Sequence, residues 1–350
     1  MISNTSTPFH TSSSRAVLTL LGTGLLLVVV MIFAISNGTL EITPSTTISA
    51  VWKGVTGQKL EGLEVIVWNL RLPRVVFGAL VGASLAACGA AFQGLFRNPL
   101  ADPYLMGSAS GAALGATIAV FVTGTASAGF AAGLFSSSSQ LVPVLAFVGA
   151  LGAAMLTLAL SRFARGGNAL ILSGVIVGGI LTSVSTYIQL RDADRMRAVF
   201  SWTLGNLSLA GWQEVLNVLP YTLFGLVALM LLARALDALQ LGEDTASTLG
   251  LNVDRIKLFT VIAASLVTAA AVSFAGIIGF VGLVAPHAMR RLGVANHRVL
   301  IPASSLAGAS LLVLADLGAR VLTRPAELPV GVVTTIVGGV FFLMLMRRKP

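Results

Sequence analysis

Few residues of this chain could do chemistry, and the clearest of them is a carboxylate inside an apolar run. Asp316 lies four residues before Arg320, a spacing that places both side chains on one face of a helix. Ionisable groups within a membrane usually serve a function, and the spacing favours an internal ion pair that orients Arg320. This hypothesis requires that Asp316→Asn weakens the binding of any partner that meets Arg320.

The sequence lacks the residue patterns of a metal site, a catalytic cluster or a disulfide. His10, His287 and His297 have no second ligand at helical spacing, which argues against a dedicated metal site. No cluster of His, Asp and Glu suggests a membrane-embedded enzyme. Cys88 is the only cysteine and lies among Ala and Gly, so it is predicted to be a packed structural thiol. We therefore expect a non-catalytic chain that binds no cofactor and no metal.

The composition is that of an integral membrane protein. Hydrophobic residues make up 56% of the 350 residues and charged residues only 10%, against roughly 25% charged residues in globular chains. The net charge of +9 comes from basic residues at the ends of apolar runs, not from one basic domain. This pattern excludes a nucleic-acid-binding protein and is typical of membrane proteins, whose Lys and Arg collect in loops.

The apolar runs predict an all-α polytopic membrane protein with about ten helices, at ~20 residues per span. One transmembrane domain is expected over residues 16–346, with a cytoplasmic tail at 1–15 and a cytoplasmic C-terminus at 347–350. The second helix is expected to be long and the eighth short and sheltered. The predicted helices cover residues 16–36, 65–95, 105–124, 140–162, 168–189, 214–236, 257–276, 279–292, 301–319 and 330–346.

The segment 71–111 begins with two arginines at a predicted helix end and continues with Gly and Ala at close intervals. Small residues let membrane helices approach one another closely. Arginines at this and other predicted outer helix ends favour the docking of an acidic partner. Snorkelling cations at helix ends are the alternative interpretation.

The one substantial polar stretch between spans covers residues 237–257 and opens with acidic residues. Its pattern predicts a short helix, a turn at Gly250 and a second helix at the cytoplasmic surface. An amphipathic connector resting on lipid headgroups is the simpler interpretation. Lipid-seeking helices favour Lys and Arg, however, so a protein partner is the better hypothesis.

An ordered set of motifs resembles the permease subunits of bacterial ABC importers for iron-siderophores, haem and vitamin B12. The set covers most of the chain. Its members are RLPR at 71–74, NPLADP at 98–103, GSASGAALGA at 107–116, LGEDTASTLGL at 241–251, GFVGLVAPHAMRRL at 279–292, NHRVLIP at 296–302, LADLGAR at 314–320 and AELPVGVVT at 326–334.

The resemblance implies a type II ABC importer permease fold in a bacterial inner (plasma) membrane, with both termini cytoplasmic. It also implies a homodimer, two ABC ATPase subunits and a periplasmic or lipid-anchored substrate-binding protein. The sequence has no G-x-x-x-x-G-K-[ST] phosphate loop, so ATP-Mg would be used by the partner ATPase.

The resemblance assigns roles to residues at both ends of the chain's membrane domain. Docking of the binding protein falls to Arg71, Arg74 and Arg320. Coupling to the ATPase falls to coupling helices at about residues 237–256 and to Leu241, Gly242, Glu243, Ala246, Leu249, Gly250 and Leu251, with Leu249 and Leu251 as anchors and Glu243 available to a basic rim. The cytoplasmic gate consists of Asn98, Leu100, Gly167 and Asn168.

The translocation path is assigned to the fifth helix and its outer continuation, through Tyr187, Gln189, Trp202, Thr203 and Asn206. Interfacial belt aromatics are an equally good interpretation of Tyr187 and Trp202. The expected cargo is an iron chelate, either a ferric siderophore or haem. Cobalamin is the alternative within the family, and an ion-coupled secondary transporter is the alternative outside it.

Overall fold

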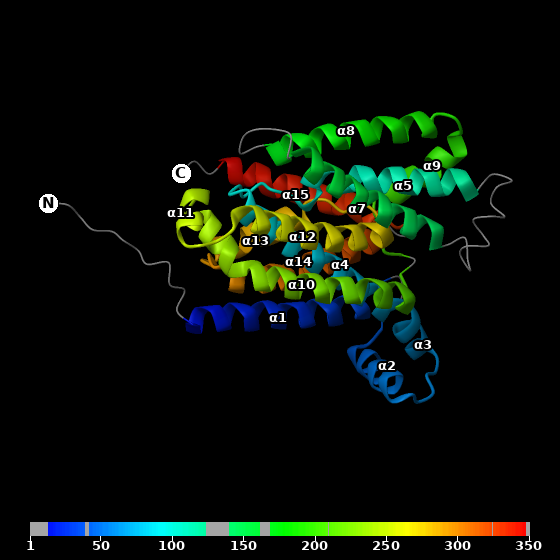
Figure 1. Cartoon of the computed structure of the whole chain (residues 1–350). Coiled ribbons are helices and arrows are strands. Elements are labelled where there is room, and N and C mark those ends of the chain that lie inside the picture. Colours follow the sequence, from blue (N-terminus) through cyan, green and yellow to red (C-terminus); the bar gives the residue numbers. More distant parts are fainter. Residues whose placement is uncertain are drawn as a thin grey trace.

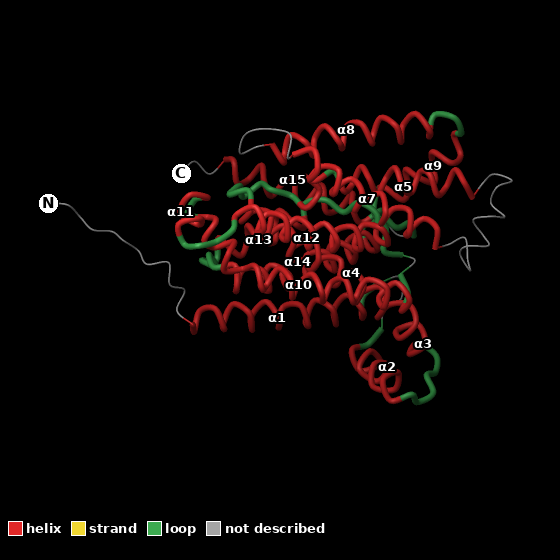
Figure 2. Tube along the Cα trace, in the orientation of Figure 1, coloured by secondary structure: helices red, strands yellow, loops and turns green. Residues whose placement is uncertain are grey.

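The structure is a computed structural model that describes residues 13–38, 42–123, 140–161, 169–208, 210–323 and 325–347. Every regular element in these ranges is helical (Figure 1, Figure 2). The elements are α1 (Ser13–Ser36), α2 (Pro44–Thr56), α3 (Leu63–Ile66), the π-helical turn η1 (Val67–Arg71), α4 (Leu72–Leu95), the 3₁₀ turn η2 (Pro103–Met106), α5 (Ser108–Thr123), α7 (Leu141–Ser161), α8 (Ala169–Gln189), α9 (Ala193–Thr203), α10 (Trp212–Gln240), α11 (Glu243–Thr248), α12 (Val253–Ala275), α13 (Val281–Arg291), α14 (His297–Val321) and α15 (Val330–Arg347).

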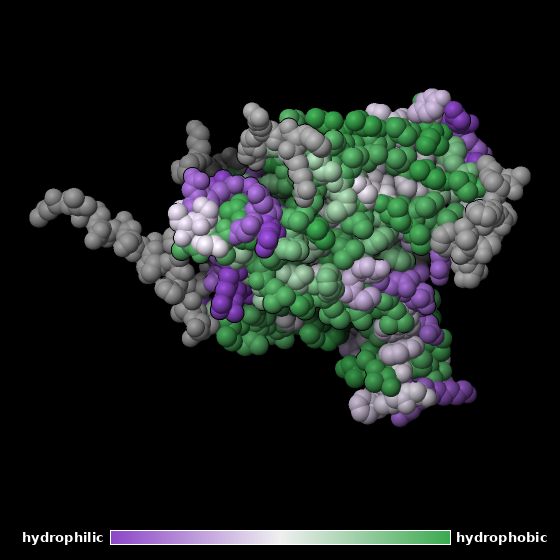
Figure 3. Space-filling model, in the orientation of Figure 1, coloured by the Kyte–Doolittle hydropathy of each residue, from purple (hydrophilic) through white to green (hydrophobic). Residues whose placement is uncertain are grey.

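Seven helices in the described ranges are long and apolar enough to cross a membrane. They are α1, the continuous helix Leu63–Leu95, α7, α8, α10, α12 and α14, while α5 and α15 are shorter apolar helices. Figure 3 shows a hydrophobic band between two more hydrophilic ends. The predicted all-α membrane fold is thus confirmed, including the long second helix. The short eighth helix is α13, whose 11 residues span only ~16 Å, so it cannot cross the bilayer by itself.

Helix α4 forms the centre of the bundle and is the most deeply buried of the long helices. It packs against α10, α12, α13 and α14, and its glycines meet the backbones of two of them. A Cβ on Gly89 would lie 2.6 Å from the carbonyl carbon of Gly282, and one on Gly308 would lie 2.6 Å from Gly82 O. The close helix approach expected from the small residues of 71–111 is therefore present.

The two ends of the bundle carry different elements. Helices α2, α3 and α9 lie at one end, where α1 and α14 terminate, and we call this the α2 end (Figure 1, right). Helix α11 lies at the opposite end, where α1 begins and α15 terminates, and we call this the α11 end.

Two helices at the α2 end were not predicted as separate elements. Helix α2 begins at Pro44 with Thr43 as its N-cap and ends at Gly57 in the left-handed conformation. Helix α9 begins after Asp192, whose carboxylate accepts hydrogen bonds from Asp194 N and Arg195 N. Both helices are short and amphipathic, so a search for long apolar runs does not detect them. Their capping residues were the available signal.

Helix α2 and α3 form a hairpin that projects from the bundle (Figure 1). Lys53 Nζ lies 2.8 Å from Glu64 Oε1 and joins the two helices. At the base of the hairpin, Trp212 Nε1 donates to Trp68 O at 2.9 Å, and the two indole rings are 5.1 Å apart. The hairpin is thus fixed to the bundle near the start of α4.

Candidate functional site

A cluster of charged side chains lies at the α2 end, where α4 and α14 meet. Asp316 on α14 lies 2.8 Å from Arg74 Nη2 on α4 and 3.0 Å from Arg320 Nε on its own helix. Glu327 lies 2.9 Å from Arg74 Nη2. We call Arg71, Arg74, Asp316, Arg320 and Glu327 the arginine cluster. The predicted ion pair of Asp316 with Arg320 is confirmed, and Arg74 is a second partner that the sequence spacing did not predict.

Two arginines of this cluster hold the end of α1. Arg71 Nη1 donates to Ile35 O at 2.6 Å, and Arg320 Nη2 donates to Ala34 O at 3.1 Å. The last carbonyls of a helix lack partners within the helix and carry partial negative charge, so guanidinium groups stabilise them. Arg320 is only 5% exposed and Arg71 is also buried. The structure therefore places all three predicted docking arginines at the α2 end, with the guanidinium groups of Arg71 and Arg320 engaged by α1 and that of Arg74 paired with Asp316.

A pocket of about 430 Å³ opens at the arginine cluster. Its walls include Arg71, Arg74, Arg320 and Glu327, together with Asn69 and Gly38. Glu327 is 36% exposed and is the most accessible of the charged groups in the cluster. Glu327 lies within the motif AELPVGVVT, from which no role was predicted for it. A pocket lined by three guanidinium groups and one carboxylate favours a partner that brings a further negative charge.

At the α11 end, a compact turn joins α10 to α12 as predicted. Ala246 of α11 is fully buried against the bundle. Gly242 and Gly250, at the two ends of α11, take positive φ angles of 121° and 82°. Leu241 and Leu249 are exposed, the latter by 63%. These two leucines form an apolar knob on the surface of the α11 end.

Two details of this knob differ from the sequence-based expectation. Leu251 is half-buried and packs against the core cluster beneath α11. Glu243 Oε2 lies 2.7 Å from Lys257 Nζ and is paired within the chain. The exposed apolar neighbour of Leu249 is therefore Leu241, not Leu251.

The predicted gate residues Asn98 and Leu100 lie in the turn that follows α4 at the α11 end. Asn98 Oδ1 accepts a hydrogen bond from Leu100 N at 2.9 Å, and both residues are exposed. The other two predicted gate residues, Gly167 and Asn168, lie outside the described residues. Beside this turn lies a pocket of about 250 Å³ that is not evident from the sequence; it is lined by Gln93, Arg97, Gln240 and Arg290.

The predicted path residues divide into two groups. Tyr187 is exposed on α8 and its hydroxyl accepts from Arg191 Nη2 at 2.9 Å. Asn206 is exposed beyond α9, where its Oδ1 accepts from Ser208 N. In contrast, Gln189 Nε2 donates to Ser185 Oγ at 2.8 Å and to an α5 hydroxyl, that of Thr117, at 3.0 Å.

Trp202 and Thr203 complete the predicted path set. Trp202 is half-buried and packs against a cluster of α5, α7 and α12. Thr203 Oγ1 donates to Phe200 O within α9. Gln189, Trp202 and Thr203 thus make structural contacts within this chain, whereas Tyr187 and Asn206 present their side chains at its surface.

Helix α8 carries a large apolar surface. Leu172, Val175, Ile176 and Ile180 are all exposed along it. Only 22% of its most apolar window is buried, against 78% for the helix Leu63–Leu95. Such a face requires lipid or another protein to cover it.

The chain is similar to permease proteins over almost its entire length. The sequence model of the FecCD transport family matches residues 26–348. The hemin transport system permease protein HmuU of Yersinia pestis is 38% identical over 93% of this chain and 95% of its own. The cobalamin import system permease protein BtuC of Halobacterium salinarum is 43% identical over 83% of this chain and 75% of its own. A solved structure described as an inward-facing conformation of a putative metal-chelate type ABC transporter matches with a TM-score of 0.81 and 27% identity, covering 94% of this chain and 99% of its own.

Proposed function

The chain belongs to the FecCD transport family and is a transmembrane permease subunit of an ABC importer, and on this premise we propose that it carries an iron chelate, a ferric siderophore or haem, across a bacterial inner membrane. The observation that carries the proposal is the end-to-end likeness to a metal-chelate type transporter. Relatives named for hemin and Fe(3+)-citrate support the same cargo class. Cobalamin is the second candidate, favoured by the 43% identity with a cobalamin import permease.

Uptake into proteoliposomes tests the cargo directly. Vesicles that contain this chain with its cognate ATPase are expected to accumulate labelled ferric siderophore or haem when the cognate binding protein and ATP-Mg are supplied. Labelled cobalamin in parallel vesicles provides the comparison. Accumulation of cobalamin alone would replace the iron chelate by the second candidate, and uptake independent of ATP would contradict the ATP-driven mechanism.

The α11 end is proposed to face the cytoplasm and to receive the ATPase. Leu241 and Leu249 give a compact apolar knob that a groove on an ATPase subunit could bind, and buried Ala246 fixes the knob to the bundle. Positive φ angles at Gly242 and Gly250 hold the turn in a defined shape. A rigid knob of this kind transmits the closure of the ATPase pair to two helices, because α10 ends beside it and α12 begins beside it.

Removal of one anchor of the knob should uncouple the two subunits. Leu249→Ser is expected to weaken ATPase association by about 2 kcal/mol, or roughly 30-fold, because a central apolar contact is lost. Co-purification and titration of the ATPase with the detergent-solubilised chain measure the effect. Leu292→Ser is the matched control, since Leu292 is 68% exposed at the same end but lies outside the knob. Equal losses in the two variants would contradict the assignment of Leu249.

The α2 end is proposed to face the periplasm and to dock the substrate-binding protein at the arginine cluster. The pocket at this cluster accepts a carboxylate that competes with Glu327 for Arg74, since Glu327 is partly exposed. Arg71 and Arg320 act on docking through the end of α1 that they hold. A docked acidic side chain would thus act on arginines that connect α1, α4 and α14.

A second copy of this chain is proposed to cover the exposed face of α8 and to enclose the path. Tyr187 and the apolar residues of α8 would then line a shared wall with few polar contacts. Such a wall lets a bulky chelate pass without being held tightly. The ion-coupled alternative lacks an equivalent explanation for the apolar knob at the α11 end.

A further inference from the structure

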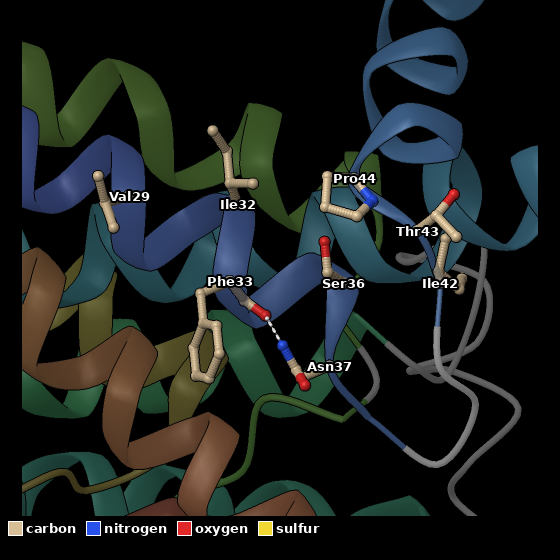
Figure 4. A pocket seen from close by; sticks show the side chains of 8 residues that line it. All are labelled: Val29, Ile32, Phe33, Ser36, Asn37, Ile42, Thr43 and Pro44. Carbon is tan, nitrogen blue, oxygen red and sulfur yellow. Dashed lines mark hydrogen bonds between the residues drawn. The ribbon is translucent and has the colours of Figure 1, made fainter.

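An open groove separates the last turns of α1 from the start of α2 at the α2 end (Figure 4). We call it the α1–α2 groove, and it is lined by Val29, Ile32, Phe33, Ser36, Asn37, Ile42, Thr43 and Pro44. Its volume is about 780 Å³, within the ~300–1,000 Å³ of typical small-molecule sites. The groove lies apart from the pocket of the arginine cluster and shares no lining residue with it.

The two ends of the groove differ in polarity. Val29, Ile32 and Phe33 form one wall on α1, and all three are exposed. They continue the apolar surface of α1, to which Leu18, Leu21 and Leu25 also belong. The polar residues Ser36, Asn37 and Thr43 line the groove at the end of α1 and the start of α2, where Ser36 points toward Pro44 and Asn37 Nδ2 donates to Phe33 O (Figure 4). The groove is therefore amphipathic along its length.

The polar end contains a hydroxyl group that has no partner among the described residues. Ser36 is only 9% exposed, yet its Oγ makes no hydrogen bond there. A buried hydroxyl without a partner destabilises the fold, so a ligand that accepts its hydrogen bond would be bound more tightly. Figure 4 shows the Ser36 side chain directed toward Pro44, across the groove from α1.

Two further features give the polar end a positive potential. Helix α2 has 13 residues and begins at the groove with Pro44 in its first turn, and a helix N-terminus favours anions. Arg71 donates to the carbonyl oxygens of Ile35 and Ser36, so its positive charge offsets the partial negative charge at the end of α1. Phosphate oxygens would thus meet a hydroxyl donor, a helix N-terminus and a nearby guanidinium charge.

We propose that the α1–α2 groove binds one glycerophospholipid of the membrane leaflet at the α2 end, with its phosphate at Ser36 and an acyl chain along Val29, Ile32 and Phe33. The position of α2 suits this ligand. Ile48, Trp52 and Val55 form an exposed apolar stripe on α2, and an amphipathic helix with such a stripe lies in the headgroup region of a bilayer. The inference is independent of the transported cargo.

Lipid retention and photolabelling test the proposal. The detergent-purified full-length chain, exposed to phosphatidylethanolamine that carries a diazirine on its acyl chain, is expected to be labelled on residues of α1 that line the groove. Native mass spectrometry should show a retained phospholipid after detergent washing. Ile32→Trp should fill the apolar wall and abolish retention, whereas Ser36→Ala should weaken it about 2- to 10-fold through loss of one hydrogen bond.

Leu25→Trp is the matched control, because Leu25 lies seven residues before Ile32 on the same exposed face of α1. It should leave retention unchanged. Equal loss in Ile32→Trp and Leu25→Trp, or label spread evenly along α1, would show ordinary surrounding lipid and overturn the proposal. If the label appeared on an added substrate-binding protein and no phospholipid were retained, the groove would be occupied by a protein. That outcome would likewise overturn the proposal.

Discussion

Asp316→Ala is expected to destabilise the folded chain by about 3–5 kcal/mol. The substitution removes the carboxylate that lies between Arg74 and Arg320 and leaves two guanidinium groups close together in a buried site. Breaking a buried ion pair by removing one partner is costly because the remaining charge is neither solvated nor paired. The end of α1 should loosen as well, since Arg320 also binds Ala34 O.

Thermal exposure of Cys88 provides the measurement. Cys88 is the only cysteine of the chain and is fully buried, so a thiol-reactive fluorogenic maleimide reports unfolding without engineered labels. Glu327→Gln is the control, because this partly exposed partner of Arg74 should contribute only about 0–1 kcal/mol. If Asp316→Ala and Glu327→Gln both had melting temperatures close to that of the wild type, the buried carboxylate of Asp316 would not stabilise the arginine cluster.

A third variant, Asp316→Asn, separates stability from docking. Asp316→Asn keeps the size of the side chain and removes its charge, so the fold should survive better than in Asp316→Ala. We expect its affinity for the binding protein to fall because Arg74 and Arg320 lose the carboxylate charge that they share. Unchanged docking and transport in Asp316→Asn would reject the hypothesis that Asp316 orients the arginines.

Gly115→Ala is expected to destabilise the chain by about 3 kcal/mol, at the upper end of the usual cost of overpacking. Gly115 lies where α5 crosses α7, and a Cβ there would lie 2.5 Å from the carbonyl carbon of Leu145 and 2.9 Å from Ala146 Cα. Both obstacles are backbone atoms, so no side chain can rotate away. The two helices would have to separate over their whole contact.

Gly152→Ala is the matched control on α7, because a Cβ at Gly152 meets no atom within 4 Å. It should be neutral or slightly stabilising. The Cys88 melting assay serves for both variants, since neither glycine lies on α4. A Gly115→Ala chain as stable as Gly152→Ala would mean that α5 and α7 are less tightly packed than the structure shows.

The sequence was sufficient to predict the elements that depend on local pattern. Hydropathy located the long helices, and the i,i+4 spacing located the pair of Asp316 and Arg320. The glycine positions of the turn around α11 also carried a local signal. Each of these features is determined within one or two helical turns.

Contacts between distant segments were not predictable in this way. Arg74 reaches Asp316 across 242 residues, and Arg320 reaches Ala34 across 286. The family resemblance assigns Gln189 to the path, and the resemblance gave no indication that its side chain bonds to Thr117 on α5. The orientation of a polar side chain on a membrane helix depends on which neighbour satisfies it, and one sequence does not reveal that neighbour.

The attachment of α1 has a consequence for movement of the bundle. Only 22% of its most apolar window is buried, while Arg71 and Arg320 bind its final carbonyls. Helix α1 also packs along α14, so its buried side and its final turn are both attached to the same helix. We therefore expect α1 to move together with α14 in a transport cycle, while its exposed side slides against lipid.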